Sequence, residues 1–211
     1  MKILIGGGST QHIYQYFLEN PHLQRNAGWF ATPNTLYPAD RYRNLLNFLG
    51  ADNGAYTNFD DQRYVDMIER FEREAYPVQW VTLPDVVCDS DTTLKLFETW
   101  APRIQKLPLA FVGQNGAESL ELPWSDFDCF FIGGDTNWKL SAAAADLVKE
   151  AIHLGKHVHM GRVNSQKRIR YAYQLGCHSI DGSAYSRWWK DRLIPDLNYL
   201  YHIEQQIFLD F

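Results

Sequence analysis

The chain has 211 residues, of which 45% are hydrophobic and 15% aromatic, enough for one sizeable core but too little for two comfortable domains. No apolar run of about 18 residues and no secretory leader pattern occurs, so we expect one cytoplasmic domain, residues 1–211, that does not associate with membranes. The net charge of −5 argues against a nucleic-acid partner, yet residues 160–192 carry seven basic and two acidic side chains and form a basic segment.

Short apolar runs alternate with helical patterns along the chain. The runs predict strands at 2–7, 28–33, 50–56, 78–87, 108–114, 128–134, 157–163 and 177–183. Helical spacing between them predicts helices at 60–75, 91–106, 141–155 and 165–176, with less regular helical stretches at 8–27 and 34–49. Strands this apolar need cover on both faces, and eight strand–helix units favour a compact, single-domain (β/α)8 barrel over an open sheet.

Polar residues follow the predicted strands. In a barrel of this kind the active site lies at the carboxyl ends of the strands, so these side chains should share one mouth. Burying several carboxylates there for packing alone would be costly, which points to function. By strand, from the third to the eighth, they are Asp52 and Asn53, Asp85, Gln114 and Asn115, Asp135 after Gly133 and Gly134, Arg162 and Asn164, and Asp181.

Three other signals have alternative interpretations. His157 and His159 share one strand face, as in metal-dependent barrel hydrolases, where Asp181 would complete a ligand set. The segment IGGGST (5–10) lacks the spacing of a nucleotide-binding loop but is compatible with a phosphate-binding turn. The segment YSRWWKD (185–191) is compatible with stacking on a nucleotide or with packing of a terminal helix.

Five segments in chain order give a family resemblance. DNGAY, LPDVVCDS, AFVGQNG, FIGGD and SIDGSAYSR resemble the strand-end motifs of tRNA-guanine transglycosylases, and together they span residues 50–187. The family's zinc subdomain motif, C-x-C-x-x-C with a later histidine, does not occur, and the three cysteines are far apart. The chain is therefore more similar to the short phage and bacterial relatives associated with 7-deazapurine modification of DNA. If the protein is viral, its compartment would be the host cytoplasm.

The resemblance implies that Asp181 is the nucleophile. Its attack on C1′ would form a covalent glycosyl intermediate, and two inversions at one carbon give net retention. Gly182 and Ser183 leave room for the sugar. The alternative is an Asp181 that caps a helix or pairs with Arg187.

Asp52 would then be the general acid/base for the departing and incoming bases. Gly54 lets a planar base approach the backbone, and Tyr56 is a candidate stacking neighbour. DNG is also a common turn sequence, so a turn without catalytic function is the alternative.

Four further residues are expected to bind the base. Asp85 and Gln114 have the donors and acceptors to read a purine edge. Gly133 and Gly134 would offer backbone N–H groups to the base carbonyl, or they mark an ordinary bend.

The resemblance implies base exchange: guanine in DNA, or in tRNA, is replaced by a 7-deazaguanine such as preQ0, with no metal or other cofactor. Basic side chains would bind the phosphates. They are Arg162, Lys167, Arg168, Arg170 and Arg187. A homodimer or a partner subunit is compatible with this short chain. The alternatives are a base-excising or nucleoside hydrolase that uses the same carboxylates or a metal on His157 and His159, and a non-catalytic barrel that binds nucleic acid.

Overall fold

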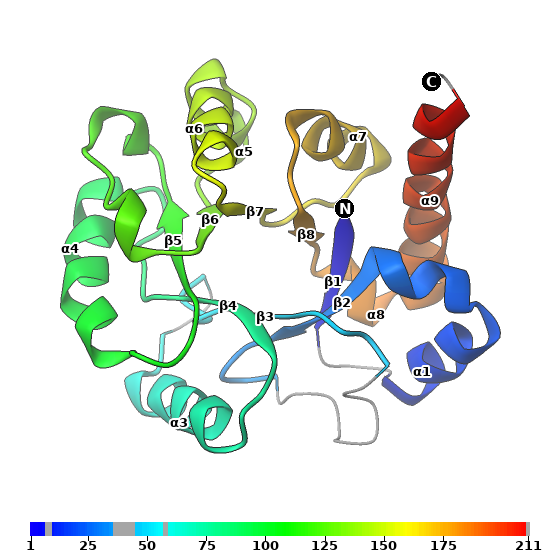
Figure 1. Cartoon of the computed structure of the whole chain (residues 1–211), viewed down its shortest axis with the longest axis horizontal. Coiled ribbons are helices and arrows are strands. Elements are labelled where there is room, and N and C mark those ends of the chain that lie inside the picture. The colour runs from blue at the N-terminus through cyan, green and yellow to red at the C-terminus, as the bar shows by residue number, and fades with distance from the viewer. Residues whose placement is uncertain (7–9, 36–44, 57–58, 210–211) are drawn as a thin grey trace.

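The computed structural model describes residues 1–6, 10–35, 45–56 and 59–209. Within these residues, eight parallel strands close into a barrel in chain order, and helices surround it (Figure 1). The barrel closes where β8 pairs with β1, with Ile3 opposite Ile180. The strands are β1 (Lys2–Gly6), β2 (Ala27–Ala31), β3 (Leu49–Ala51), β4 (Val78–Thr82), β5 (Leu109–Gly113), β6 (Cys129–Ile132), β7 (His157–Met160) and β8 (Ser179–Asp181). The predicted (β/α)8 barrel is confirmed.

The helices cover the outer face of the barrel. The α-helices are α1 (Thr10–Glu19), α3 (Asp61–Arg73), α4 (Ser90–Trp100), α5 (Thr136–Lys139), α6 (Ala142–His153), α7 (Gln166–Leu175), α8 (Ala184–Arg187) and α9 (Ile194–Leu209). The 3-10 segments are η1 (Pro21–Asn26), η2 (Ala101–Arg103), η3 (Ala117–Ser119) and η4 (Trp124–Asp126), and η5 (Trp189–Leu193) is a π-helix. No helix in the described ranges combines the length and hydrophobicity needed to cross a bilayer.

The helices begin at side-chain caps that the sequence pattern predicts. Asp60, Asp89, Ser141 and Ser165 each accept a hydrogen bond from the backbone N–H three residues on. Helix α7 ends at Gly176, whose φ of 92° is a left-handed conformation that suits glycine.

Alternation along the strands separates two cores. In β5, Leu109 and Phe111 pack outward against the helices, whereas Ala110 and Val112 belong to the cluster inside the barrel. The large Trp80 ring fits this interior because β3 has a glycine beside it: a Cβ on Gly50 would lie 2.4 Å from the ring. Small and large side chains thus fill the interior together.

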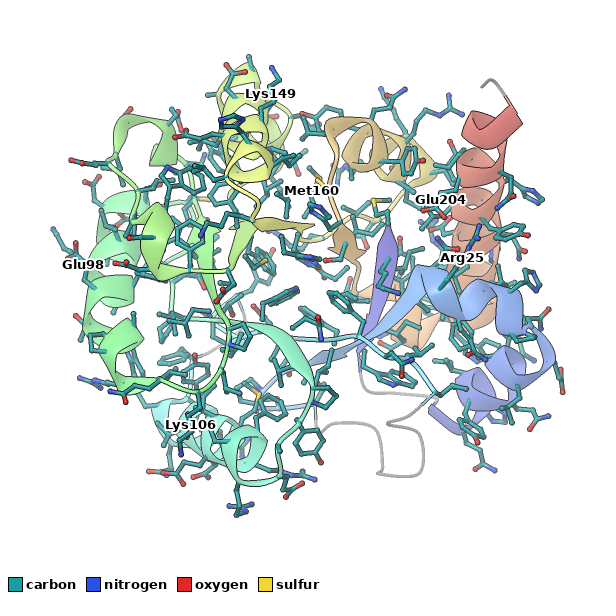
Figure 2. The ribbon with its side chains drawn as sticks, in the orientation of Figure 1. Arg25, Glu98, Lys106, Lys149, Met160 and Glu204 are labelled. Carbon is teal, nitrogen blue, oxygen red and sulfur yellow. The ribbon has the colours of Figure 1, made fainter. Side chains whose placement is uncertain are left out.

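Helix α9 contacts η1, the segment that precedes β2. Glu204 accepts a hydrogen bond from Asn26 Nδ2 at 2.7 Å and lies beside Arg25 (Figure 2), with 3.9 Å between the charged atoms. Met160, at the end of β7, lies in the upper half of the same view.

Several strands end earlier than predicted. Strand β3 stops at Ala51 instead of 56, because the side chain of Asn53 accepts from Ala55 N at 2.6 Å and turns the backbone. Strand β4 stops at Thr82 instead of 87, ahead of Pro84, which has no N–H for a ladder bond. These early ends give loops that carry polar side chains over the mouth.

Candidate active site at the barrel mouth

Three aspartates meet at the carboxyl end of the barrel. Asp52 follows β3, Asp85 lies three residues beyond β4, and Asp181 ends β8. The charges of Asp85 and Asp181 both raise the pKa of Asp52, so both carboxylates lie near Asp52 at the mouth. The structure thus brings together the acidic residues that the sequence placed there.

Asp52 is poised to exchange a proton. Its Oδ1 accepts from Thr82 Oγ1 at 3.2 Å and its Oδ2 from Gly54 N at 3.3 Å. Burial, and then the charges of Asp85 and Asp181, raise the pKa of this carboxyl from 3.8 to about 7. Near neutral pH Asp52 therefore occupies both protonation states, as a general acid/base requires.

Asp181 is held through one oxygen. Its Oδ1 lies 3.1 Å from His159 Nε2 and accepts from Arg162 N, also at 3.1 Å. The side chain keeps 14% of its surface exposed. Within the described ranges Oδ2 has no hydrogen bond, and Arg187 makes no ion pair with Asp181. The alternative in which Asp181 pairs with Arg187 is therefore wrong, and Oδ2 is available for attack.

Gln114 positions Asp85, and its own polar atoms are used within the protein. Its Nε2 donates to Asp85 Oδ2 at 2.6 Å, and its Oε1 accepts from Cys88 N at 2.9 Å and Gly134 N at 2.8 Å. Asn53 Nδ2 donates to the other oxygen of Asp85 at 2.8 Å. The prediction that Gln114 reads a base edge needs correction, because the buried amide holds the carboxylate that would do so.

Gly133 and Gly134 serve packing instead of base contact. The Gly133 N–H donates to Gly113 O at 2.9 Å, and the Gly134 N–H is bonded to Gln114. A Cβ on Gly134, whose φ is 46°, would come within 2.3 Å of the Trp138 ring. The predicted N–H contacts to the base are therefore wrong for both glycines, and the bend interpretation holds.

Arg162 lies across the mouth. Its backbone is left-handed, with φ 59°, and its guanidinium donates to the Gly134 carbonyl. The guanidinium carbon lies 4.6 Å from the centre of the Tyr56 ring, which is 65% exposed. Tyr56 thus lies beside the mouth, against the Arg162 guanidinium. Its stacking on a base and the binding of a phosphate by Arg162 stay predictions.

Lys167 and Arg168 begin α7, the helix that follows β7, and therefore lie at the mouth end of the barrel. Lys167 is exposed, and Arg168 Nη2 donates to Thr136 Oγ1 at 3.4 Å. Both lie at the rim of the mouth, and their contact with phosphates stays a prediction.

The other two basic residues differ. Arg170 points toward α9, where its Nε donates to Tyr199 Oη at 2.8 Å, so it does not face the mouth. Arg187 is exposed at the end of α8. The predicted phosphate contacts therefore do not lie in one row. This holds for Lys167, Arg168, Arg170 and Arg187.

Lys139 is a site residue that the sequence pattern did not indicate. Its side chain is buried, and Nζ donates to Gly161 O at 2.7 Å, which fixes the loop that carries Arg162. Burial and then the charge of Arg162 lower its pKa to about 8. A lysine in a four-residue helix carries no periodicity signal, so only the tertiary contact reveals it.

His157 and His159 share one face, as predicted, but they bind a serine. His157 Nε2 and His159 Nδ1 both lie 2.8 Å from Ser179 Oγ. In the part of the chain that the structure describes, no three His, Cys, Asp or Glu side chains are grouped to hold a metal ion. Both histidines are thus joined by hydrogen bonds to the same serine hydroxyl.

The two remaining sequence signals have separate outcomes. Residues 7–9 of the glycine-rich segment lie outside the described residues. In the tryptophan pair, the Trp189 ring stacks on His12 with centroids 6.2 Å apart and meets Tyr16 edge-on, whereas Trp188 is 58% exposed. Helix packing therefore accounts for Trp189, and Trp188 remains at the surface.

Comparison with known proteins supports the fold. No family model matches the chain, and neither does any curated protein. Among solved structures, CdNal from Clostridium difficile in complex with mannosamine is similar, with a TM-score of 0.51, 10% identity, and coverage of 99% of this chain and 82% of that one. A monomeric dihydrodipicolinate synthase variant has a TM-score of 0.46 and 12% identity over 88% of this chain and 69% of its own. At 10% identity, the likeness to CdNal concerns the barrel fold alone.

Proposed function

We propose that the chain is a base-exchange transglycosylase that replaces guanine in nucleic acid, specifically DNA, with a 7-deazaguanine such as preQ0. The observation that carries this proposal is the difference between two carboxylates at one mouth. Asp52 titrates near neutrality, whereas Asp181 is held by N–H donors through a single oxygen. Two carboxylates with different environments suit glycosyl transfer, in which one acts as acid/base and the other as nucleophile.

The proposed reaction has two displacements. Asp181 Oδ2 attacks C1′ of the target nucleotide, the C1′–N9 bond breaks, and protonated Asp52 gives its proton to the leaving guanine. The incoming base then loses its N9 proton to ionised Asp52, and N9 attacks C1′. The ester bond to Asp181 breaks, which restores both carboxylates and retains the sugar configuration.

The residues around the two carboxylates are suited to bind and orient the base. Asp85, held by Asn53 and Gln114, is the acceptor for the ring N–H and amino group of the base. Tyr56, stacked on Arg162, offers an aromatic face at the rim. A target base in duplex DNA must leave the stack to reach this depth, at a cost of a few kcal/mol that phosphate contacts offset.

The test is mass spectrometry of nucleosides from DNA and from tRNA after incubation with isotope-labelled preQ0. Labelled nucleoside is expected with the wild-type chain, and no label above background with Asp181→Asn or Asp52→Asn. Asp146→Asn is the matched control, because Asp146 is a surface residue of α6 paired with Lys149, and it should retain full activity.

Three outcomes would contradict the proposal. Full incorporation by Asp181→Asn would rule out Asp181 as the nucleophile. Release of guanine without incorporation identifies a base-excising hydrolase, and nucleic-acid binding without either reaction identifies a non-catalytic barrel.

A further inference from the structure

A continuous hydrogen-bonded chain runs inside the barrel to the mouth. His157 at the start of β7 contacts Ser179, Ser179 contacts His159, and each step spans 2.8 Å. His159 Nε2 completes the chain to Asp181 Oδ1 at 3.1 Å. The four side chains alternate between β7 and β8, so the register of two neighbouring strands builds the chain.

His159 lies in an aromatic enclosure. Its ring is fully buried and stacks on Phe30 with centroids 6.0 Å apart and planes 12° apart. Trp80 and Phe131 approach it at 4.8 and 4.6 Å. Apolar rings around the imidazole leave its two nitrogens with Ser179 and Asp181 as their partners.

Burial keeps both imidazoles neutral. It lowers the pKa of His157 to about 3, with His159 and His178 acting in the same direction. It also lowers the pKa of His159, against the opposing effect of Asp181 and with that of Lys139. These are the titratable groups that act on the two rings.

Asp181, at the end of this hydrogen-bonded row, sets the direction of every hydrogen bond in it. An ionised Asp181 only accepts, so His159 must carry its proton on Nε2. Its Nδ1 is then an acceptor, and Ser179 must donate its hydroxyl hydrogen there. The Ser179 oxygen in turn accepts from His157 Nε2–H, so all three donors point toward the mouth.

We infer that His159 is a positioning residue for Asp181, that the Asp181 carboxylate sets the Nε2–H tautomer of His159, and that Ser179 supports this tautomer by donating to Nδ1. The N–H groups of His159 Nε2 and Arg162 N both bond to Oδ1 of Asp181. They hold this oxygen in place and leave Oδ2 for attack on the sugar. This inference rests on the proposed function for its catalytic consequence. A neutral donor orients the carboxylate without the full positive charge that an arginine or lysine would place on it, so the carboxylate stays nucleophilic.

Long-range 1H–15N NMR of histidine side chains tests the arrangement without any activity. At pH 7, His159 should be neutral with the proton on Nε2, and Asp181→Ala should give a mixture of tautomers because the acceptor of the Nε2–H bond is lost. Observation of Nδ1–H or of a doubly protonated His159 in the wild-type chain would overturn the inference, whatever the enzyme does.

Kinetics of two His159 variants separate positioning from packing. The Nε2 amide of His159→Gln can replace the donor to Asp181, whereas His159→Leu fills space without it. We expect His159→Leu to lower the single-turnover exchange rate about 100-fold with KM unchanged, and His159→Gln to recover most of that loss.

The outcomes are distinguishable from failure of the proposed function. Equal losses in both variants, each with wild-type thermal stability, would show that the N–H donor is irrelevant and overturn the inference. If His159→Leu fails to fold, the NMR result and the rate of His159→Gln decide. Full exchange by Asp181→Asn, in contrast, would end the transglycosylase proposal while leaving the NMR result intact.

Discussion

At the scale of single residues, two aspartates of the same site lie in different environments. Asp52 and Asp181 have the same side chain, but Asp52 lies among other carboxylates and Asp181 accepts bonds from an imidazole and a backbone amide. Sequence reasoning identified both residues from their places after strands. It grouped His159 with Asp181 only as candidate metal ligands and did not anticipate the hydrogen bond between them, because that contact depends on the register between β7 and β8.

The raised pKa of Asp52 predicts a pH-dependent stability. The unfolded chain releases this proton near pH 3.8 and the folded chain only at about 7, so stability falls as pH rises across that window. Asp52→Asn removes the penalty of the ionised form. It should raise the free energy of unfolding at pH 8 by about 2 kcal/mol, after allowance for partial solvent screening, and leave it nearly unchanged at pH 4.

Urea unfolding of the wild-type chain and Asp52→Asn at both pH values measures this difference. An equal effect of the substitution at pH 4 and pH 8 would show that Asp52 is not protonated at neutral pH in the folded chain.

At the scale of elements, the strands were predictable and their ends were not. All eight predicted strands exist, because apolar runs and barrel burial agree along the chain. Early termination after β3 and β4 depends on the side-chain turn of Asn53 and on Pro84. The short α5, which carries Lys139, is below the length at which periodicity is readable.

Packing inside the barrel predicts a coupled pair, Gly50 and Trp80. Gly50→Ala places a methyl group 2.4 Å from the Trp80 ring and should cost about 1–3 kcal/mol of stability. Trp80→Phe makes room and removes a buried indole N–H that has no hydrogen-bond partner among the residues that the structure describes. The loss of stability in the double variant should be smaller than the sum of the two single losses by at least about 1 kcal/mol.

A double-mutant cycle of denaturant unfolding measures this coupling. Gly155→Ala provides the control, because no atom of the described residues lies within 4 Å of its added Cβ. The cost of this substitution comes from its backbone φ of 73°, and it should add to that of Trp80→Phe. Additive costs for the Gly50 and Trp80 pair would contradict the packing described inside the barrel.

At the scale of the whole molecule, charge is distributed unevenly. The chain has a net charge of −5, whereas Lys167 and Arg168 put positive charge at the mouth end of α7. Counting charges along the sequence located the basic segment at residues 160–192. It could not tell that Arg170, on the same helix, turns to Tyr199, because that depends on where α9 packs.

DNA affinity should reflect this division of α7. Lys167→Gln and Arg168→Gln should each weaken binding and lower the slope of log K against log salt by about one. Arg170→Gln, the same charge change on the same helix, should leave the slope nearly unchanged. Fluorescence anisotropy between 50 and 200 mM salt is the measurement, and equal slope changes for all three variants would show that binding senses only total charge.

The central claim is a covalent bond between Asp181 and the sugar. Mass spectrometry of the protein after incubation with DNA, without an incoming base, measures it directly. We expect an adduct whose peptide maps to Asp181 and which disappears when preQ0 is added. Turnover without any adduct, or an adduct on another residue, would contradict the double displacement on which the account depends.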